Sequence, residues 1–257
     1  MTGMMYSDAL GLVPGDVAAM IGSGGKTSLL FRLADENRGR RVLVSTTTKM
    51  FMPHVGVGSS RPCSAAGAVD WDISDAGDGG RPMAAPTAGI HLLHGGKLGE
   101  KIIAPPPGQL ALACADAELA LLECDGSKGL PLKGWAAYEP VVPNFVTVTV
   151  GVLPLWAVGQ AVGPELVHRV ELFCALTGAE IGEPVTPAHL AAVIGHPAGL
   201  FRETQGRRVL FLNYRQGEPG PELAEALVKI LPPAVRQGLD AVLAGDVHSG
   251  TVRRIEL

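Results

Sequence analysis

Short apolar runs alternate along the chain with segments whose apolar residues recur at helical spacing. The apolar runs predict strands, because each is short and is bounded by glycine, proline or polar residues. The helical segments fall between them, which is typical of an α/β fold with a largely parallel sheet flanked by helices. The predicted strands are Val17–Ile21, Val42–Ser45, Gly89–Leu93, Leu119–Cys124, Asn144–Val150, Val209–Asn213 and Ala241–Ala244. The predicted helices are Thr27–Asn37, Gln109–Ala115, Pro164–Thr177, Pro187–Gly195 and Pro221–Leu231.

The same pattern divides the chain into three parts. Residues 1–151 carry most of the predicted strands, and residues 152–205 are predicted to be a mainly helical insertion or subdomain. A buried-strand pattern returns at Val209–Asn213, so residues 206–257 are predicted to be the C-terminal part of the α/β core. The segment Gly56–Thr87 is rich in Gly, Ser, Ala, Pro and Asp, and we interpret it as a long surface excursion.

Composition narrows the classes of partner. Hydrophobic residues make up 47% and charged residues 18% of the 257 residues, which is typical of a globular protein. A formal net charge of −4 gives no argument for nucleic acid or an anionic membrane as a partner. Met1–Asp16 contains no Lys or Arg, unlike a signal peptide, and the apolar stretch Phe145–Val158 is too short and too polar to span a bilayer. The cysteines show no C-x-x-C spacing and the histidines are scattered, so we expect a cytoplasmic protein without a structural metal site.

The strongest candidate for chemistry is the glycine-rich turn after the first predicted strand, Gly22-Ser23-Gly24-Gly25-Lys26-Thr27-Ser28. Consecutive small residues let backbone N–H groups converge on phosphate oxygens, and the following helix adds donors and partial positive charge. Lys26 can reach the terminal phosphates of ATP or GTP, and the Thr27 hydroxyl can hold Mg²⁺. The pattern is shorter than G-x-x-x-x-G-K-[ST], because Met20 stands in place of the first glycine. Residues 1–151 are therefore predicted to be a P-loop-like nucleotide-binding core, and a glycine-rich turn with an exposed lysine is the alternative.

A second candidate follows the strand predicted at Val42–Ser45, where the sequence continues Thr46-Thr47-Thr48-Lys49. Ligands of open parallel sheets bind beyond the carboxyl ends of the strands. Thr46, Thr47 and Lys49 are therefore expected near Lys26 if the two strands are neighbours, with Lys49 as a candidate catalytic group. The alternative is an ordinary threonine-rich strand end, since threonine favours strands.

A third candidate is the buried strand Leu119–Cys124, which ends in the carboxylates of Glu123 and Asp125. Strand alternation places these two on the same side and Cys124 on the other. Two converging carboxylates repel each other unless a cation lies between them. We predict that both bind Mg²⁺ together with Thr27 and contribute to catalysis, while an acidic turn without function is the alternative.

The loop after these carboxylates adds two lysines. Lys128 and Lys133 are expected to meet an anionic substrate there, beside Lys26 and Lys49. Asn213 ends a predicted strand, but no aspartate follows it as in a guanine-binding N-K-x-D motif, so the base is left open. His168 and Arg169 lie on the helix predicted from Pro164, where a charged, solvated face is the simplest interpretation.

Together these elements resemble the selenium-dependent molybdenum hydroxylase accessory family of the YqeC type. Two departures are Cys124, where the family pattern suggests alanine, and the Tyr214-Arg215-Gln216 segment, which bears on base recognition. The matching segments are Ile21–Ser28, Ser45–Met50, Glu123–Lys133, Glu139–Pro143, Val167–Arg169 and His196–Phe201.

The resemblance implies a cytosolic, Mg²⁺-dependent nucleotide-binding protein that acts in maturation of the selenium or molybdenum cofactor of molybdenum hydroxylases. A hydroxylase apo-protein and an anionic cofactor precursor would then be partners. One hypothesis is an enzyme that hydrolyses ATP or GTP or transfers its phosphoryl group. The other hypotheses are a nucleotide-gated cofactor carrier, in which Cys124 would hold selenium or sulfur, a Mur-ligase-like ligase, and a binding module without catalysis.

Overall fold

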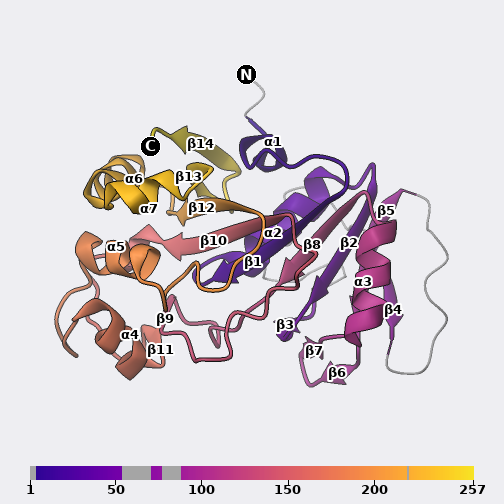
Figure 1. The fold of residues 1–257 in the computed structure, drawn as a ribbon, viewed down its shortest axis with the longest axis horizontal. Coiled ribbons are helices and arrows are strands. Elements are labelled where there is room, and N and C mark those ends of the chain that lie inside the picture. Colours follow the sequence, from indigo (N-terminus) through magenta and orange to yellow (C-terminus); the bar gives the residue numbers. More distant parts are fainter. Residues whose placement is uncertain (1–3, 54–70, 77–87, 219) are drawn as a thin grey trace.

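A computed structural model describes residues 4–53, 71–76, 88–218 and 220–257. Its centre is a nine-stranded sheet in the order β14-β13-β12-β10-β1-β8-β2-β5-β4 (Figure 1). Every neighbouring pair is parallel except β13 and β14, which are antiparallel. The strands are β1 (Asp16–Gly22), β2 (Arg41–Thr46), β4 (Trp71–Asp75), β5 (Gly89–His94), β8 (Leu119–Glu123), β10 (Val148–Pro154), β12 (Arg207–Asn213), β13 (Ala241–Asp246) and β14 (Thr251–Ile255).

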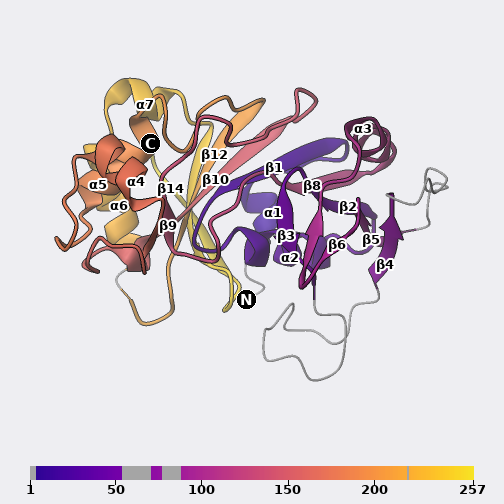
Figure 2. The ribbon, with the colours of Figure 1, turned by 90° about the horizontal axis from the view of Figure 1, so that it is seen from below.

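Helices cover both faces of the sheet. One buried apolar cluster joins the sheet to α1 and α2, and a second joins its other face to α3, α4, α5 and α6. Figure 2 shows α1 and α2 on the side of the sheet opposite α3. The central strands are apolar on both faces because each face is covered, as parallel sheets require. The helices are α1 (Tyr6–Ala9), α2 (Lys26–Glu36), α3 (Pro107–Asp116), α4 (Val170–Thr177), α5 (Pro187–Gly195), α6 (Gly220–Ile230) and α7 (Pro233–Gln237).

Two small sheets stand near the carboxyl ends of β2 and β8. The first is antiparallel, with the order β3-β7-β6, and we call it the flap; its strands are β3 (Lys49–Phe51), β6 (Lys97–Leu98) and β7 (Lys101–Ile103). The second pairs β9 (Leu132–Lys133) with β11 (Val167–His168) in parallel. Because β3 follows β2 and β9 follows β8 along the chain, both small sheets lie at the edge where the parallel strands end.

The mixed α/β fold with a mostly parallel sheet is confirmed, and the differences from the predicted elements are local. Strand β10 begins at Val148 instead of Asn144, because Val146 N donates to Pro143 O in a preceding turn. Helix α4 begins at Val170 instead of Pro164, because the residues before it pair as β11. Within the predicted surface excursion, Trp71–Asp75 forms edge strand β4, and the rest of that segment lies largely outside the described residues.

The segment predicted as a helical insertion contains a short 3₁₀ helix (Leu155–Ala157), β11, α4 and α5. Strand β10 extends into it as far as Pro154. Phe173 of α4 and Leu190 of α5 are fully buried in the same apolar cluster as the sheet. These elements therefore pack directly on the α/β core, and the division into three parts stays an interpretation.

Candidate functional site

The glycine loop, Gly22–Ser28, connects the end of β1 to the start of α2. Gly24 has φ +72°, and a Cβ added there would lie 2.5 Å from the Pro154 ring. Gly25 has φ +139°, and its added Cβ would lie 2.5 Å from Asn213 Nδ2. That amide also donates to Gly24 O at 2.7 Å. The ends of β10 and β12 thus press against the loop so closely that only glycine fits at these two positions.

The start of α2 offers backbone donors that the helix does not use. Its first backbone hydrogen bond runs from Leu29 N to Gly25 O at 2.9 Å, and no side chain of the described residues caps it. The N–H groups of residues 26–28 therefore remain available at the positive end of the helix. In the same loop the Ser23 hydroxyl is buried and has no hydrogen-bond partner among the described residues. Unpaired donors of this kind suit a bound oxyanion.

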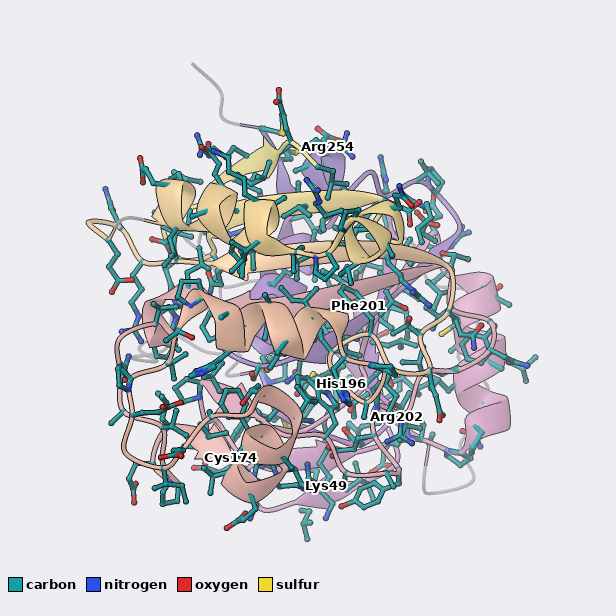
Figure 3. All side chains as sticks on the ribbon, turned by 60° about the vertical axis from the view of Figure 1, so that its left-hand side comes forward. Lys49, Cys174, His196, Phe201, Arg202 and Arg254 are labelled. Carbon is teal, nitrogen blue, oxygen red and sulfur yellow. The ribbon has the colours of Figure 1, made fainter. Side chains whose placement is uncertain are left out.

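The loop forms one wall of a cavity of about 160 Å³ whose rim is strongly basic. Four lysines contribute to its lining, and Glu123 is the acidic side chain among the described lining residues. The exposed side chain of Lys49 lies toward the lower margin of the molecule in Figure 3. The lining is Gly24–Ser28, Lys49, Phe51, Lys101, Glu123 and Gly126–Leu130. A cavity with this excess of positive charge favours an anionic ligand.

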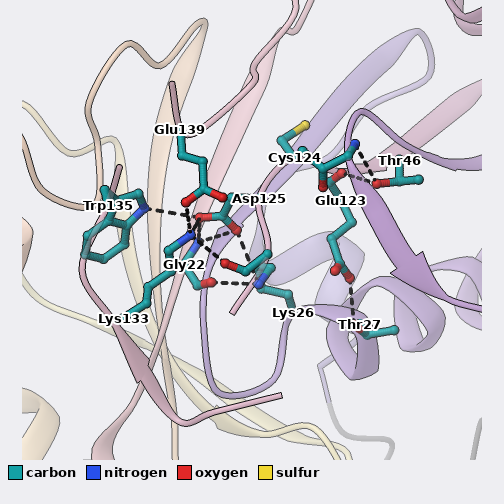
Figure 4. A network of polar contacts seen from close by, with 12 residues as sticks. Gly22, Lys26, Thr27, Thr46, Glu123, Cys124, Asp125, Lys133, Trp135 and Glu139 are labelled. Carbon is teal, nitrogen blue, oxygen red and sulfur yellow. Dashed lines mark hydrogen bonds and ion pairs between the residues drawn. The ribbon is translucent and has the colours of Figure 1, made fainter. Parts of the chain in front are cut away.

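Glu123 meets the glycine loop at the floor of this cavity. The Thr27 hydroxyl donates to Glu123 Oε2 at 2.6 Å (Figure 4). Burial raises the pKa of Glu123, although Lys26 and the Thr27 hydrogen bond oppose the shift. A hydroxyl and a carboxylate side by side next to an anion site are the ligand types that Mg²⁺ takes together with phosphates and waters.

Asp125 lies behind the loop, and four groups donate to its fully buried carboxylate. Gly22 N lies 3.1 and 3.0 Å from its two oxygens, and Trp135 Nε1 lies 3.1 Å from Oδ2. Lys26 Nζ is 3.2 Å from Oδ1, and Lys133 Nζ is 3.1 Å from Oδ2 (Figure 4). Burial alone raises the pKa of Asp125, but the two ammonium groups outweigh burial and hold that pKa below its usual value.

Lys26 is the cation that separates the two carboxylates. Its Nζ donates to Gly22 O at 2.6 Å, and the side chain is 4% exposed. Burial lowers the pKa of Lys26, but Asp125 and Glu123 outweigh burial and raise it, so the ammonium stays charged. Glu123 and Asp125 therefore lie on the same side of the chain, as strand alternation predicts, and Lys26 relieves their repulsion.

Lys133 continues this polar network away from the cavity. Its Nζ is fully buried and bonds Glu139 Oε2 at 2.9 Å and Gly126 O at 2.7 Å. Glu139 in turn accepts from Arg169 Nη1 at 2.6 Å. Burial raises the pKa of Glu139, but the Arg169 and Lys133 hydrogen bonds outweigh burial and lower it. An unbroken chain of ion pairs thus runs from Lys26 to Arg169, just before α4.

The structure separates the predicted site residues into two groups. Lys26, Thr27, Lys49, Glu123 and Lys128 line the cavity with the glycine loop. Gly22 and Ser23 lie outside this lining: Gly22 N bonds Asp125, and the Ser23 hydroxyl has no partner among the described residues. The other predicted polar residues make internal hydrogen bonds instead. Thr46 Oγ1 donates to Glu123 O at 2.8 Å, Thr47 Oγ1 donates to Val141 O at 2.7 Å, and Asp125 and Lys133 are held within the ion-pair network.

Three geometric expectations change. Strand β2 is not the neighbour of β1, because β8 lies between them, yet Lys49 still reaches the cavity through the flap. Lys133 lies in β9, not in an open loop. Arg169 adopts the left-handed conformation at φ +57° before α4 and is paired with Glu139, so the prediction of a solvated helix face is wrong for this residue.

Sequence reasoning missed three side chains that the structure brings to the site. Lys101 and Phe51 line the cavity from the flap, and Trp135 donates to Asp125. Each lies in a segment without a recognisable motif, where only the antiparallel pairing of β3 with β7 or the fold of the loop after β8 sets its position. Phe51 directly follows apolar Met50, so the triplet Lys49-Met50-Phe51 lacks the polar–apolar alternation that would have marked a half-buried strand.

Cys124 points away from the cavity into the apolar cluster on the other face of the sheet. It is fully buried, and burial raises the pKa of its thiol well above the usual range. A neutral, inaccessible thiol is a poor nucleophile and a poor ligand. Among the residues that the structure describes, no group of three or more His, Cys, Asp and Glu side chains is arranged to hold a metal ion.

A family model described as YqeC protein matches residues 18–171. A protein of Escherichia coli (strain K12) that carries the name Uncharacterized protein YqeC is 32% identical over 250 residues, which cover 93% of this chain and 91% of the relative. No solved structure shows significant similarity to the chain. In the described part of the structure, every helix is too short or too polar to cross a membrane.

Proposed function

This chain belongs to the YqeC family, and we propose that it binds the phosphates of ATP or GTP together with Mg²⁺ at the glycine loop and hydrolyses or transfers the terminal phosphoryl group. The observation that carries the proposal is the 2.6 Å contact between Thr27 and Glu123 at the floor of a cavity lined by four lysines. Helix-terminal N–H groups, the buried Ser23 hydroxyl and two glycines with positive φ support the phosphate part of the proposal.

In this proposal, different residues of the chain bind the phosphates and stabilise the charge that develops during transfer. The N–H groups at the start of α2 would hold the phosphate oxygens, and Lys26 would add its charge where negative charge develops during transfer. To reach a terminal phosphate, Lys26 Nζ gives up its contacts with Gly22 O and Asp125. Asp125 tolerates this change, because Lys133, Trp135 and Gly22 N still donate to it.

Thr27 and Glu123 would hold Mg²⁺, which when bound neutralises phosphate charge. Binding of a cation there favours ionised Glu123, whose pKa burial raises in its absence. Asp125 was predicted as a third ligand, but its oxygens accept from four donors, so we assign it to holding Lys26 and the loop.

The cellular role that we propose is maturation of the selenium or molybdenum cofactor of molybdenum hydroxylases. It rests on the resemblance of the sequence segments and not on the geometry. Transfer to an anionic cofactor precursor is the favoured reaction, because three lysines from outside the glycine loop, Lys49, Lys101 and Lys128, also line the cavity. The burial of Cys124 gives no support to the hypothesis of a thiolate carrier.

Isothermal titration of the purified protein with ATP and GTP, with and without Mg²⁺, tests the proposal. We expect Mg²⁺-dependent binding that weakens by about 10- to 100-fold in Lys26→Met, since a charged hydrogen bond contributes about 1.5–3 kcal/mol. Lys229→Met is the matched control, because Lys229 is exposed in the last turn of α6. Absence of nucleotide binding by the wild type, or equal affinity of Lys26→Met and wild type, refutes the proposal.

A turnover assay separates the enzyme from its alternatives. Release of phosphate that depends on Mg²⁺ and is lost in Lys26→Met supports an enzyme. Tight nucleotide binding without turnover, even with a hydroxylase apo-protein present, identifies a binding module instead. Slow turnover that the apo-protein strongly stimulates favours the nucleotide-gated carrier.

A further inference from the structure

The geometry points to a second ligand subsite on the flap, where Lys49, Lys101 and Phe51 bind a small molecule that carries a phosphate-like dianion on a flat ring. The inference rests on the proposed function, because this molecule would be the acceptor that faces the nucleotide phosphates across the cavity. Neither the YqeC family model nor the relative's name specifies such a molecule.

The register of the flap places these side chains on one face. In the antiparallel pair β3–β7, Lys49 lies opposite Ile103 and Phe51 lies opposite Lys101. The residues between them, Met50 and Ile102, are also paired and are almost completely buried in the apolar core. Because side chains alternate along a strand, anchoring Met50 and Ile102 in the core turns Lys49, Phe51 and Lys101 together toward the cavity.

The flap adds two positive charges to the one that Lys26 of the glycine loop supplies. Lys26 belongs to the loop and is already paired with Asp125, whereas Lys49 and Lys101 come from a separate sheet. Lys101 lines the same cavity as Glu123, so its charge adds to that of Lys49 there. Two ammonium groups on one face of a cavity match a doubly charged anion better than a single carboxylate.

The third member of the face is aromatic. Phe51 is half-buried in the cavity wall, and Lys101 Nζ lies 4.5 Å from the centre of its ring. This contact holds the ammonium over one face of the ring. A flat ligand can stack on Phe51 while its anionic group meets the two lysines, and such stacking contributes about 0.5–1.5 kcal/mol beyond the burial of area. A dianion on a flat ring is therefore favoured over an aliphatic anion.

The test titrates phosphonate probes into the protein saturated with Mg²⁺ and the non-hydrolysable analogue AMP-PNP. Phenylphosphonate should bind about 3- to 10-fold more tightly than methylphosphonate because of stacking. Lys101→Met should weaken phenylphosphonate about 10-fold or more, and Phe51→Leu should remove the preference for phenyl over methyl. Lys97→Met is the matched control, since Lys97 is exposed on β6 and is not among the lining residues.

The outcomes distinguish the two proposals. Equal phenylphosphonate affinity in Lys101→Met and wild type overturns the subsite, as does displacement of AMP-PNP by phenylphosphonate, which would place both on the glycine loop. Lys101-dependent binding of phenylphosphonate without any binding of AMP-PNP supports the subsite and refutes the nucleotide proposal. Far-ultraviolet circular dichroism and melting curves identify a variant that fails to fold, and Lys101→Gln then replaces Lys101→Met.

Discussion

Lys133, which is buried in the ion-pair network, gives the sharpest prediction about the stability of the fold. Lys133→Met keeps most of the apolar stem but removes an ammonium group that contacts Asp125, Glu139 and Gly126 O at 3.1, 2.9 and 2.7 Å. Removing one partner of a buried ion pair typically costs about 3–5 kcal/mol, because the remaining charge stays buried. Here Asp125 keeps Lys26 and Glu139 keeps Arg169, so we expect the low end, about 3 kcal/mol.

Urea denaturation at pH 7 measures this loss: the urea concentration at the unfolding midpoint should fall, while the slope of the unfolding free energy against urea stays unchanged. The melting temperature should fall by about 6–12 °C. Lys128→Met is the matched control, because Lys128 is exposed on the cavity rim and its removal should change stability by less than about 0.5 kcal/mol. A loss below about 1 kcal/mol in Lys133→Met would show that the network contributes little and would refute the reasoning.

The pH dependence of this difference has a definite sign. Burial opposes ionisation of Asp125, but Lys26 and Lys133 outweigh it and depress its folded pKa. Its contribution to stability is therefore complete above the unfolded pKa of aspartate, about 3.9, and is lost as the pH falls through the lower folded pKa. Without Lys133 the depression is smaller, so the stability gap between wild type and Lys133→Met should narrow as the medium becomes more acidic than about pH 4.

Two further substitutions probe the cavity. Glu123→Gln should raise stability at pH 7 by about 0.5–2 kcal/mol while weakening Mg²⁺-dependent nucleotide binding, because burial raises the pKa of Glu123 and ionising it opposes folding. The stability gain of Glu123→Gln over wild type should disappear as the pH falls from the raised pKa of folded Glu123 toward the ordinary pKa of glutamate. A variant that is less stable than wild type in urea at pH 7 would contradict this prediction. Gly24→Ala should lose about 1–3 kcal/mol and nucleotide binding, since φ is +72° and the new Cβ meets Pro154 at 2.5 Å. Gly39→Ala, where the space is open, is its control, and equal melting temperatures of the two variants would contradict the steric argument.

Most of the large sheet could be predicted from the sequence, because its buried strands are apolar runs between clear breaks. The edge strands were missed for a physical reason. In β4, Trp71–Asp75 is largely exposed and polar, so it has no apolar run, and in β14 the pattern of Thr251–Ile255 is equally polar. Strand order was also beyond the sequence, since the pairing of β1 with β8 and β10 depends on tertiary packing.

The sequence predicted those site residues that belong to a local motif and missed those that only the pairing of distant strands brings to the cavity. The glycine loop and Glu123 are set by neighbouring residues and by the strand period, and the structure brings them together at 2.6 Å between Thr27 and Glu123. Lys101 is more than seventy positions from Lys26 in the chain and reaches the cavity only because β7 pairs with β3. The sequence also could not show which lysines are buried, because nothing in it distinguishes exposed Lys128 from fully buried Lys133.

The contrast between the two strand-end carboxylates has a single electrostatic cause. Asp125 accepts from two ammonium groups and two N–H groups, so burial is more than offset and its pKa falls; Glu123 accepts from one hydroxyl, so burial prevails and its pKa rises. A carboxylate with a raised pKa beside a lysine-lined cavity is the one that gains most from an added cation. The network therefore leaves Glu123 as the side chain at which Mg²⁺ binding would recover the most energy, while Asp125 keeps the glycine loop in place when Lys26 moves.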